Sequence, residues 1–505
     1  MKKLISLFAL FILSTGIYGQ STFNKLELFL NSNNNSSEFF GNITILDNYI
    51  FGEVAIFDSI NQPYTGIVKL NINGDLISKN FLQYSGARIA TYQNQNFIST
   101  SDSNLVLCSN LRFDSTANWD GYLVKLDTNL DTLWTRVYDL PSNLANCTDS
   151  INVPNFFTAI KETPDKGFII TGNYQRNCIN NATNQRGFLL KVDSVGNVQW
   201  WKVYHNVTDL YDIELTEDAG YAFVNKYAYP KFTKLDSLGN IQWEIMINAY
   251  AEGWVNMGDI TPLGNYEYIV VKTYQYDINY KFGIHICKIN INTQQIIWEK
   301  AYQLYHDVNC VSLNKVMGVE VNNSGDIIVW ATSHVIDRPY GGGKRAAVLK
   351  LNSQGDSLWA KYYDSPNCTW YDELQLNDLI ITDDGGFLGV GYQYFYDTGR
   401  VKAWLFKTDS NGVIGWDTST PLSVPNLRVY PNPATDFTNI EFGNELNKEA
   451  NIEIYNSLGQ LVLFNKIAKG EQAYRLELKS LNSGIYFFGV FDDKLLLGGG
   501  KFVKE

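Results

Sequence analysis

The chain of 505 residues carries a net charge of −12 and no cluster of Lys and Arg. A nucleic-acid-binding surface is therefore excluded, because phosphate binding needs clustered cations. Apolar residues make up 45% of the chain and charged residues 18%, which excludes a largely disordered protein. The 32 Tyr, 28 Phe and 12 Trp favour an all-β fold, since aromatic residues are enriched in strands.

The first residues, MKKLISLFALFILSTGIYGQ, have the pattern of a secretory signal peptide. Lys2 and Lys3 precede an apolar run, and small or polar residues follow it. The run is shorter than the roughly 20 residues that a membrane-spanning helix needs, and no later segment is long and apolar enough. We expect residues 1–19 to be removed and an exported protein with no transmembrane span.

A ten-residue motif then recurs seven times along the chain. Its copies start with a Lys, continue through Asp or Asn and usually Gly, and mostly end in Trp. They are KLNINGDLIS (69–78), KLDTNLDTLW (125–134), KVDSVGNVQW (191–200), KLDSLGNIQW (234–243), KININTQQIIW (288–298), KLNSQGDSLW (350–359) and KTDSNGVIGW (407–416). Their first lysines lie 43 to 66 residues apart.

A second half-repeat precedes most copies: a turn cluster followed by an apolar run, as in TPDKGFIITGNY (163–174) and TDDGGFLGVGYQY (382–394). Four short strands in each of seven units predict a seven-bladed β-propeller over residues 20–416. A stacked β-solenoid is the competing architecture, but its repeats are usually shorter. The strand TFNKLELFL (22–30) resembles the last strand of each unit, so we expect it to complete the seventh blade.

The pattern changes after the linker DTSTPLSVPN (417–426). Alternating apolar residues over 427–505 predict a small antiparallel β-sandwich. Within it, VYPNP (429–433), IYNSLGQLV (454–462), LNSGIYFF (481–488) and a basic end resemble the type A C-terminal sorting domain of the type IX secretion system. The resemblance implies a Bacteroidetes-type protein that the type IX translocon recognises through residues 427–505 and delivers to the cell surface or the medium.

The repeated motif has two chemical interpretations. Asp193 and Asn197 could be calcium ligands, but the loop is shorter than a 12-residue calcium loop and lacks its final acid. A hairpin turn, in which Asp bonds the local backbone and Gly takes a positive φ, explains it better. The motif also resembles the Trp-docking pattern of pyrroloquinoline-quinone propellers and bacterial D-x-F-V-x-K-L-D-x-x-G repeats. It has a shorter loop than the former and no vicinal cysteine pair, so no metal and no cofactor is predicted.

Tight turns within each unit would share one face, and the longer, variable loops the opposite face, where binding residues concentrate. On that face the sequence suggests ligand-binding residues rich in Tyr, Trp, Arg and His. They are Trp370, Tyr371, Tyr394, Tyr396, Arg400, His306 and His334. Such residues suit a glycan or protein ligand.

No catalytic residues can be assigned. No G-x-S-x-G motif is present, and His205, His306 and His334 come from different units. We expect a binding or adhesion module. The alternative is an extracellular glycan hydrolase or lyase that uses paired carboxylates across a central funnel.

The six cysteines permit disulfides in an exported protein. Cys147–Cys178, both in loops of one unit, is the first candidate pair, and Cys310–Cys368 is the second. Cys108 and Cys287 fall inside predicted strands and are expected to be buried thiols.

Overall fold

A computed structural model describes most of the chain. The residues that it describes are 22–27, 29–30, 37–57, 63–91, 95–113, 119–140, 155–177, 183–204, 207, 210, 212–225, 230–247, 258–277, 281–302, 311–336, 344–365, 372–414, 428–442, 446, 449–456, 461–492 and 495–505. They form two compact units, residues 1–416 and 417–505. Every regular element in the described ranges is a β-strand, which confirms the all-β fold.

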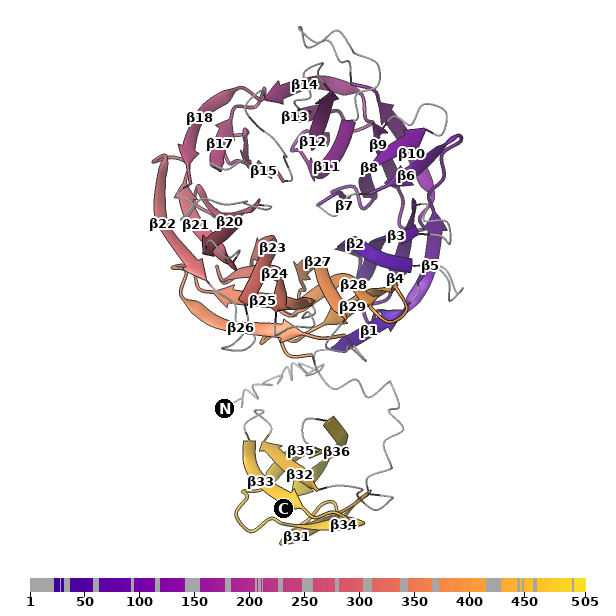
Figure 1. Cartoon of the computed structure of the whole chain (residues 1–505), viewed down its shortest axis with the longest axis vertical. Helices are drawn as coiled ribbons and strands as arrows, with labels where there is room; N and C mark the ends of the chain where they lie inside the picture. The colour runs from indigo at the N-terminus through magenta and orange to yellow at the C-terminus, as the bar shows by residue number, and fades with distance from the viewer. Residues whose placement is uncertain are drawn as a thin grey trace, which may run out of the picture. The chain divides into compact units, whose positions relative to one another are not determined.

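The N-terminal unit is built of small antiparallel sheets arranged around a common centre (Figure 1). The first sheet contains β2 (Ser37–Leu46), β3 (Tyr49–Phe57), β4 (Pro63–Leu70) and β5 (Leu76–Phe81). The second contains β6 (Ala87–Ala90), β7 (Phe97–Ser99), β8 (Leu105–Phe113), β9 (Trp119–Leu126) and β10 (Thr132–Tyr138). The third contains β11 (Asn155–Glu162), β12 (Phe168–Asn177), β13 (Thr183–Val192) and β14 (Val198–Tyr204), and the fourth β15 (Glu214–Leu215), β16 (Tyr221–Val224), β17 (Lys231–Leu235) and β18 (Ile241–Met246).

The remaining strands of this unit form one eight-stranded and one four-stranded sheet. The larger contains β19 (Gly258–Gly264), β20 (Glu267–Asp277), β21 (Lys281–Asn290), β22 (Gln295–Tyr302), β23 (Val311–Val321), β24 (Ile327–Ile336), β25 (Lys344–Leu351) and β26 (Ser357–Tyr363). The smaller contains β27 (Glu373–Ile381), β28 (Phe387–Phe395), β29 (Arg400–Lys407) and β1 (Phe23–Glu27).

The eight-stranded sheet differs from the separate four-stranded units that the repeat predicts. It consists of two antiparallel groups, β19–β22 and β23–β26, joined by a parallel pairing of Phe282 with Leu313. The pairing lies near the beginning of both β21 and β23, which are ten and eleven residues long. Each group therefore keeps the four-strand pattern of the other sheets, and only the ends of two long strands meet.

The repeated motif forms a hairpin turn, as predicted. Oδ1 of Asp193 accepts hydrogen bonds from the backbone N–H groups of Val195 (3.0 Å) and Asn197 (2.8 Å), and Oδ2 accepts one from Nδ2 of Asn197 (2.9 Å). Gly196 has a φ of 84°, which a side chain would disfavour. The carboxylate is thus used by its own turn, and the calcium interpretation fails.

The lysine that starts the motif ties two turns of one sheet together. Nζ of Lys191 lies 2.9 Å from Oδ2 of Asp165, which belongs to the turn between the first two strands of the same sheet. The same pairing recurs as Lys125–Asp102, Lys234–Asp218, Lys350–Asp326 and Lys407–Asp384. Both tight turns therefore lie at one end of each sheet, as the sequence predicts.

The tryptophan that ends the motif packs on the next sheet. A Cβ atom placed on Gly239 would lie 2.8 Å from the ring of Trp200, and the hydroxyl of Tyr204 donates to the carbonyl of Gly239 at 2.8 Å. Equivalent contacts join Trp134 and Tyr138 to Gly196, Trp298 and Tyr302 to Gly355, and Trp359 and Tyr363 to Gly412. The predicted packing role of the tryptophan is confirmed.

The N-terminal strand β1 pairs with β29, at the edge of the sheet that contains the last repeat. Phe23 takes the place of the tryptophan, since a Cβ atom on Gly74 of the first sheet would lie 2.9 Å from its ring. Lys25 adds an ion pair to Asp75 at 2.5 Å. The two ends of the unit's sequence thus share one sheet and contact the first sheet.

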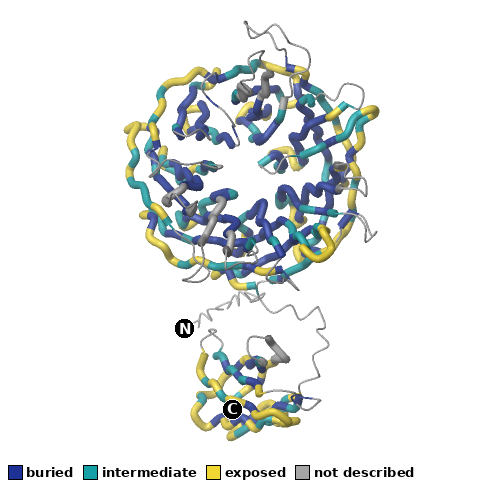
Figure 2. The backbone as a smooth tube through the Cα atoms, viewed as in Figure 1, coloured by how far each residue is buried: buried dark blue, intermediate teal, exposed yellow. Residues whose placement is uncertain are grey.

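Burial follows the order of strands within each sheet. The middle strands are almost fully buried, whereas the outermost strands β5, β18 and β26 alternate between exposed and half-buried residues (Figure 2). Each outermost strand therefore presents one side to solvent and one to the neighbouring sheet.

The C-terminal unit contains two antiparallel sheets that enclose one core. One sheet has β30 (Arg428–Tyr430), β31 (Phe437–Glu441) and β34 (Ala473–Glu477), and the other has β32 (Ala450–Asn456), β33 (Leu461–Ile467), β35 (Gly484–Asp492) and β36 (Leu495–Lys504). The core includes Ile440, Ile452, Leu476, Val490 and Phe502. Gly500 makes room for the ring of Phe488, because a Cβ atom at position 500 would lie 2.9 Å from that ring.

We predict that Phe23→Ala destabilises the protein by about 3–5 kcal/mol, because the buried ring fills space between two sheets. Chemical denaturation of the full chain measures this. The matched control is Glu27→Ala, an exposed position of the same strand, which should change stability by less than about 0.5 kcal/mol. Deleting residues 20–31 should lower Tm sharply, and an unchanged Tm would refute the role of β1.

Candidate functional site

The structure places some of the predicted ligand-binding residues and corrects the local structure of others. Tyr394 lies in β28, Tyr396 begins a turn and is 71% exposed, and Arg400 begins β29. These three residues, expected on variable loops, lie instead in strand and tight turn, in which the N–H of Gly399 bonds the carbonyl of Phe395. The rings of Tyr394 and Tyr396 pack edge to face with centroids 6.4 Å apart.

His334 also differs from the prediction. It lies in strand β24, paired with Lys344 of β25, and not in a loop. The strands extend further than expected because their pairing continues without interruption from Ile327 to His334. Trp370, Tyr371 and His306 lie outside the described residues.

The predicted pairs Cys147–Cys178 and Cys310–Cys368 lie outside the described residues as well. Cys108 and Cys287 are buried free thiols, as predicted. Burial raises the pKa of the Cys287 thiol to about 12 and that of Cys108 further. Both thiols are therefore unreactive in the folded protein.

We predict that the denatured, unreduced protein has two free thiols, because only Cys108 and Cys287 remain outside the two proposed bridges. Thiol titration in denaturant measures this number. Six free thiols would remove both bridges, and the reduced protein is the control for complete reaction.

The inner strands carry a set of acidic residues that the sequence analysis missed. Each accepts a hydrogen bond from the backbone N–H of the next inner strand around the centre. The bonds are Asp212 to Ile260 (3.3 Å), Asp259 to Val319 (2.7 Å), Glu320 to Ile381 (3.1 Å) and Asp378 to Ile43 (3.0 Å). We call these four residues the carboxylate ring.

A weak sequence signal for the ring exists. Asp212 and Asp378 each lie four residues before the threonine that starts the following tight turn, Thr216 or Thr382. Glu320 lies two residues before the corresponding Asn322, so the spacing is not constant. The inner strands contain bulges, for example between Leu376 and Asp378, which change the spacing from one sheet to the next.

Lys161 is the cation beside the carboxylate ring. Its Nζ lies 2.6 Å from Oε1 of Glu214, and its charge also acts on Asp259. Burial, followed by the charge of Asp212 and a side-chain hydrogen bond with it, raises the pKa of Asp259 well above its usual value. Burial likewise raises the pKa of Asp378 to about 6 and that of Glu320 to about 7.

Four of these groups, Lys161, Glu214, Glu320 and Asp378, border a cavity of about 270 Å³, whose lining also includes Asn42 and Gln95. The pKa values of Asp259, Glu320 and Asp378 are raised because a buried charge without a full partner is unfavourable. In the described part of the chain, no group of three or more His, Cys, Asp or Glu residues has an arrangement that could hold a metal ion. The hydrogen bonds of the carboxylate ring connect neighbouring inner strands.

We predict that the protein is more stable near pH ~5.5 than near pH ~8. Glu53 is fully buried, accepts a bond from Thr91 of the second sheet, and has a pKa raised by burial from 4.5 to about 7. When the pKa of a carboxyl is higher in the folded state than in the unfolded state, its protonated form stabilises the fold. This stabilisation is complete below the unfolded-state pKa and is lost as the pH rises through the folded-state pKa. Between these two pH values the loss for Glu53 is on the order of 2 kcal/mol, because about 1.5 pH units lie between pH ~5.5 and its folded-state pKa.

Urea denaturation at both pH values measures the effect. Glu53→Gln, which keeps an acceptor oxygen for Thr91, should reduce the difference between the two pH values. Glu27→Gln, on the exposed side of β1, should leave it unchanged. Equal stability of the unmodified protein at both pH values would contradict the prediction.

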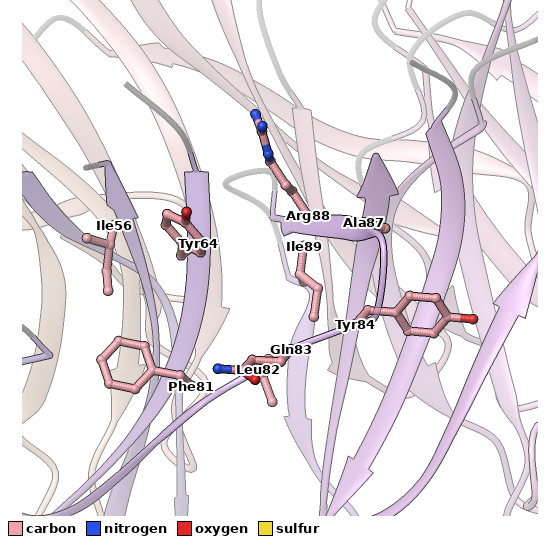
Figure 3. Close-up of a pocket in the computed structure, with 9 residues that line it drawn as sticks. All are labelled: Ile56, Tyr64, Phe81, Leu82, Gln83, Tyr84, Ala87, Arg88 and Ile89. Atoms are coloured by element: carbon pink, nitrogen blue, oxygen red, sulfur yellow. The ribbon is translucent and has the colours of Figure 1, made fainter. Parts of the chain in front are cut away.

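A second cavity, of about 470 Å³, lies at the end of the first two sheets away from their tight turns. We call it the β4–β6 pocket. Its described lining is Ile56, Tyr64, Phe81, Leu82, Gln83, Tyr84, Ala87, Arg88 and Ile89 (Figure 3). Figure 3 shows Tyr64 on one side, Arg88 and Ile89 on the other, and segment 81–84 running between them.

The connection between the two sheets accounts for the position of this pocket. Strand β5 ends at Phe81 and β6 begins at Ala87, so the connection between the first two sheets is short. The other connections between consecutive sheets are longer: the shortest spans residues 303–310 and the longest spans residues 139–154. The short crossing is held by bonds from Leu82 N–H to Thr65 and from Ala87 N–H to Tyr84. The hydroxyl of Thr65 also donates to the carbonyl of Ile89 at 3.1 Å, which fixes β4 against β6.

Comparison with protein families assigns the C-terminal unit. Residues 428–503 match the secretion system C-terminal sorting domain. The chain therefore carries a type IX sorting domain, and its destination is the cell surface or the medium, which confirms the resemblance seen in the sequence. None of the described residues belongs to a helix that could cross a membrane.

The N-terminal unit has remote structural likenesses. A protein of unknown function from Bacteroides caccae has 9% identity over 65% of this chain and 94% of that one, with a TM-score of 0.36. Polysaccharide lyase Uly1 has 10% identity over 73% of this chain and 90% of its own, with a TM-score of 0.43. The WD40 β-propeller domain of Doa1 has 9% identity over 73% of this chain and 95% of its own, with a TM-score of 0.37. Likenesses this remote carry no information about activity.

No curated protein matches the chain.

Proposed function

We propose that residues 20–416 form a closed seven-bladed β-propeller that binds a glycan or protein ligand outside the cell. The linker 417–426 joins it to the sorting domain, residues 427–505, through which the type IX translocon of a Bacteroidetes-type cell delivers it. Residues 1–19 are the signal peptide for the first export step.

Three observations support the closed ring of seven. The repeat has seven copies, and dividing the eight-stranded sheet at its parallel pairing leaves seven groups. Strand β1 pairs with β29 and contacts Gly74 of the first sheet as the tryptophans do in the others. Asp378 of the last sheet bonds Ile43 of the first, which continues the carboxylate ring.

The binding function rests mainly on the β4–β6 pocket. It combines half-exposed aromatic side chains with polar groups at the end of the sheets where variable connections lie. Tyr394 and Tyr396 add a second aromatic pair beside Arg400. Aromatic faces next to planar polar groups are the usual composition of ligand-binding surfaces.

An enzyme that acts on glycans is the second candidate. The neighbouring carboxyls of Asp212 and Asp259 near Lys161 favour it, since burial raises the pKa of Asp259 and perturbed pKa values often occur at catalytic sites. Against it, Asp212 and Asp259 each accept a backbone hydrogen bond from a neighbouring sheet. Their removal would disturb the fold as well as any chemistry.

Two assays on the purified full chain distinguish the candidates. Glycan-array and protein-pulldown screening should find saturable binding, and the bound glycan should be recovered intact, because Asp212 and Asp259 already accept backbone hydrogen bonds from neighbouring sheets. Reducing-sugar release and formation of unsaturated products measure hydrolysis and elimination. Turnover of any bound glycan would overturn the binding function in favour of the enzyme.

A further inference from the structure

We propose that the β4–β6 pocket binds an uncharged pyranose unit of a glycan. This inference rests on the proposed binding function and names the ligand class for one site. The residues that carry it come from β4, the end of β5 and the crossing to β6, and no sequence motif marks them.

Two aromatic rings of the pocket are left uncovered by the protein. Tyr64 is 46% exposed and Phe81 is 42% exposed, although both are large hydrophobic residues. Within the described part of the chain, neither ring stacks on another aromatic ring or lies beneath a cation. By contrast, the exposed ring of Tyr49 lies 4.1 Å beneath Nζ of Lys69. Two uncovered rings in one pocket mark a ligand-binding site, and flat apolar rings pack well on the C–H face of a pyranose.

The free polar groups of the pocket suit sugar hydroxyl groups. The hydroxyl of Tyr64 and the carboxamide of Gln83 make no hydrogen bond with another described residue. A hydroxyl both donates and accepts, and a carboxamide has separate donor and acceptor atoms. Sugar hydroxyl groups need both kinds of partner, whereas an anion only accepts. These two side chains therefore match a sugar better than an anion.

The charge of the pocket does not call for an ionic ligand. Arg88 is the one charged side chain in the described lining, and it already takes part in an interaction within the protein. Its side chain points away from Phe81 (Figure 3). An anion without a free cation to pair with loses its hydration at high cost when it enters a largely apolar site. An uncharged ligand unit is therefore favoured.

The size of the pocket favours a small ligand unit over a protein. A volume of about 470 Å³ is within the range of small-molecule sites, roughly 300–1,000 Å³. A stable protein interface involves roughly 20–30 residues of each partner, whereas the described lining is confined to the few residues shown in Figure 3. Buried Ile89 faces Tyr64 across the pocket, so a ligand there lies between an aliphatic and an aromatic wall.

The test is calorimetric titration of the full chain with neutral oligomers of glucose, mannose and galactose. The oligomers of glucuronate, mannuronate and galacturonate are their matched charged references. At least one neutral oligomer should bind roughly tenfold more tightly than its charged reference. Raising the salt concentration from about 0.05 M to about 0.5 M should leave this binding unchanged, because no ion pair contributes to it. Failure of all three neutral oligomers to bind, or preference for a charged reference, would overturn the proposal.

Variants locate the ligand in this pocket. Tyr64→Ala and Phe81→Ala should each weaken binding of the neutral oligomer roughly tenfold, because each removes a ring that packs on the sugar. Tyr64→Phe keeps the ring and loses only the hydroxyl, so it should weaken binding less than Tyr64→Ala does. Thermal denaturation checks that each variant is folded.

Tyr266→Ala is the matched control. Tyr266 is a 38% exposed aromatic residue in the tight turn between β19 and β20, at the end of the sheets away from the pocket. This variant should bind the neutral oligomer as the unmodified protein does. Weakening of binding by Tyr266→Ala as strong as that by Tyr64→Ala would contradict the assignment to the pocket.

The outcomes separate this inference from the proposed function. If a neutral oligomer binds equally well to Tyr64→Ala, Phe81→Ala and the unmodified protein, the propeller is a binding module and the pocket is not its site. If only a protein or a charged glycan binds, the ligand class is wrong and the binding function stands. If the unmodified chain binds no glycan and no protein, both the proposed function and this inference fail.

Discussion

The fold of the N-terminal unit depends on the contact between one sheet's tryptophan and the next sheet's turn glycine. The Trp200 ring lies at an outermost strand, where its own sheet cannot cover it. It is covered only because Gly239 lacks a side chain and Tyr204 bonds the same turn. No single sheet therefore buries its apolar surface alone, and the sheets are stable only as neighbours.

A second set of contacts holds the sheets at the centre. The carboxylate ring provides acceptors for buried backbone N–H groups of the inner strands, whose own sheets do not continue beyond them at the centre. The cost is that several carboxyls are removed from water beside one lysine, Lys161. Their raised pKa values follow from this arrangement, and they couple the stability of the unit to pH.

Function is expected where the repeat is broken rather than where it is kept. The tight turns are occupied by their own hydrogen bonds, as Asp193 shows. The short connection between β5 and β6 departs from the other connections, and the β4–β6 pocket lies there. Tyr64, Phe81 and Arg88 are brought together from three strands, so no local motif marks them.

The sequence by itself determined the repeat, the hairpin turns, the packing tryptophans, the N-terminal strand that joins the sheet of the last repeat, and the sorting domain. Each is encoded by residues close together in the chain, or by a pattern that recurs, and such signals need no knowledge of distant contacts. The tertiary structure alone decided the carboxylate ring and the β4–β6 pocket. Asp378 and Ile43 lie 335 residues apart in the sequence, and only the arrangement of the sheets around a common centre brings such residues together.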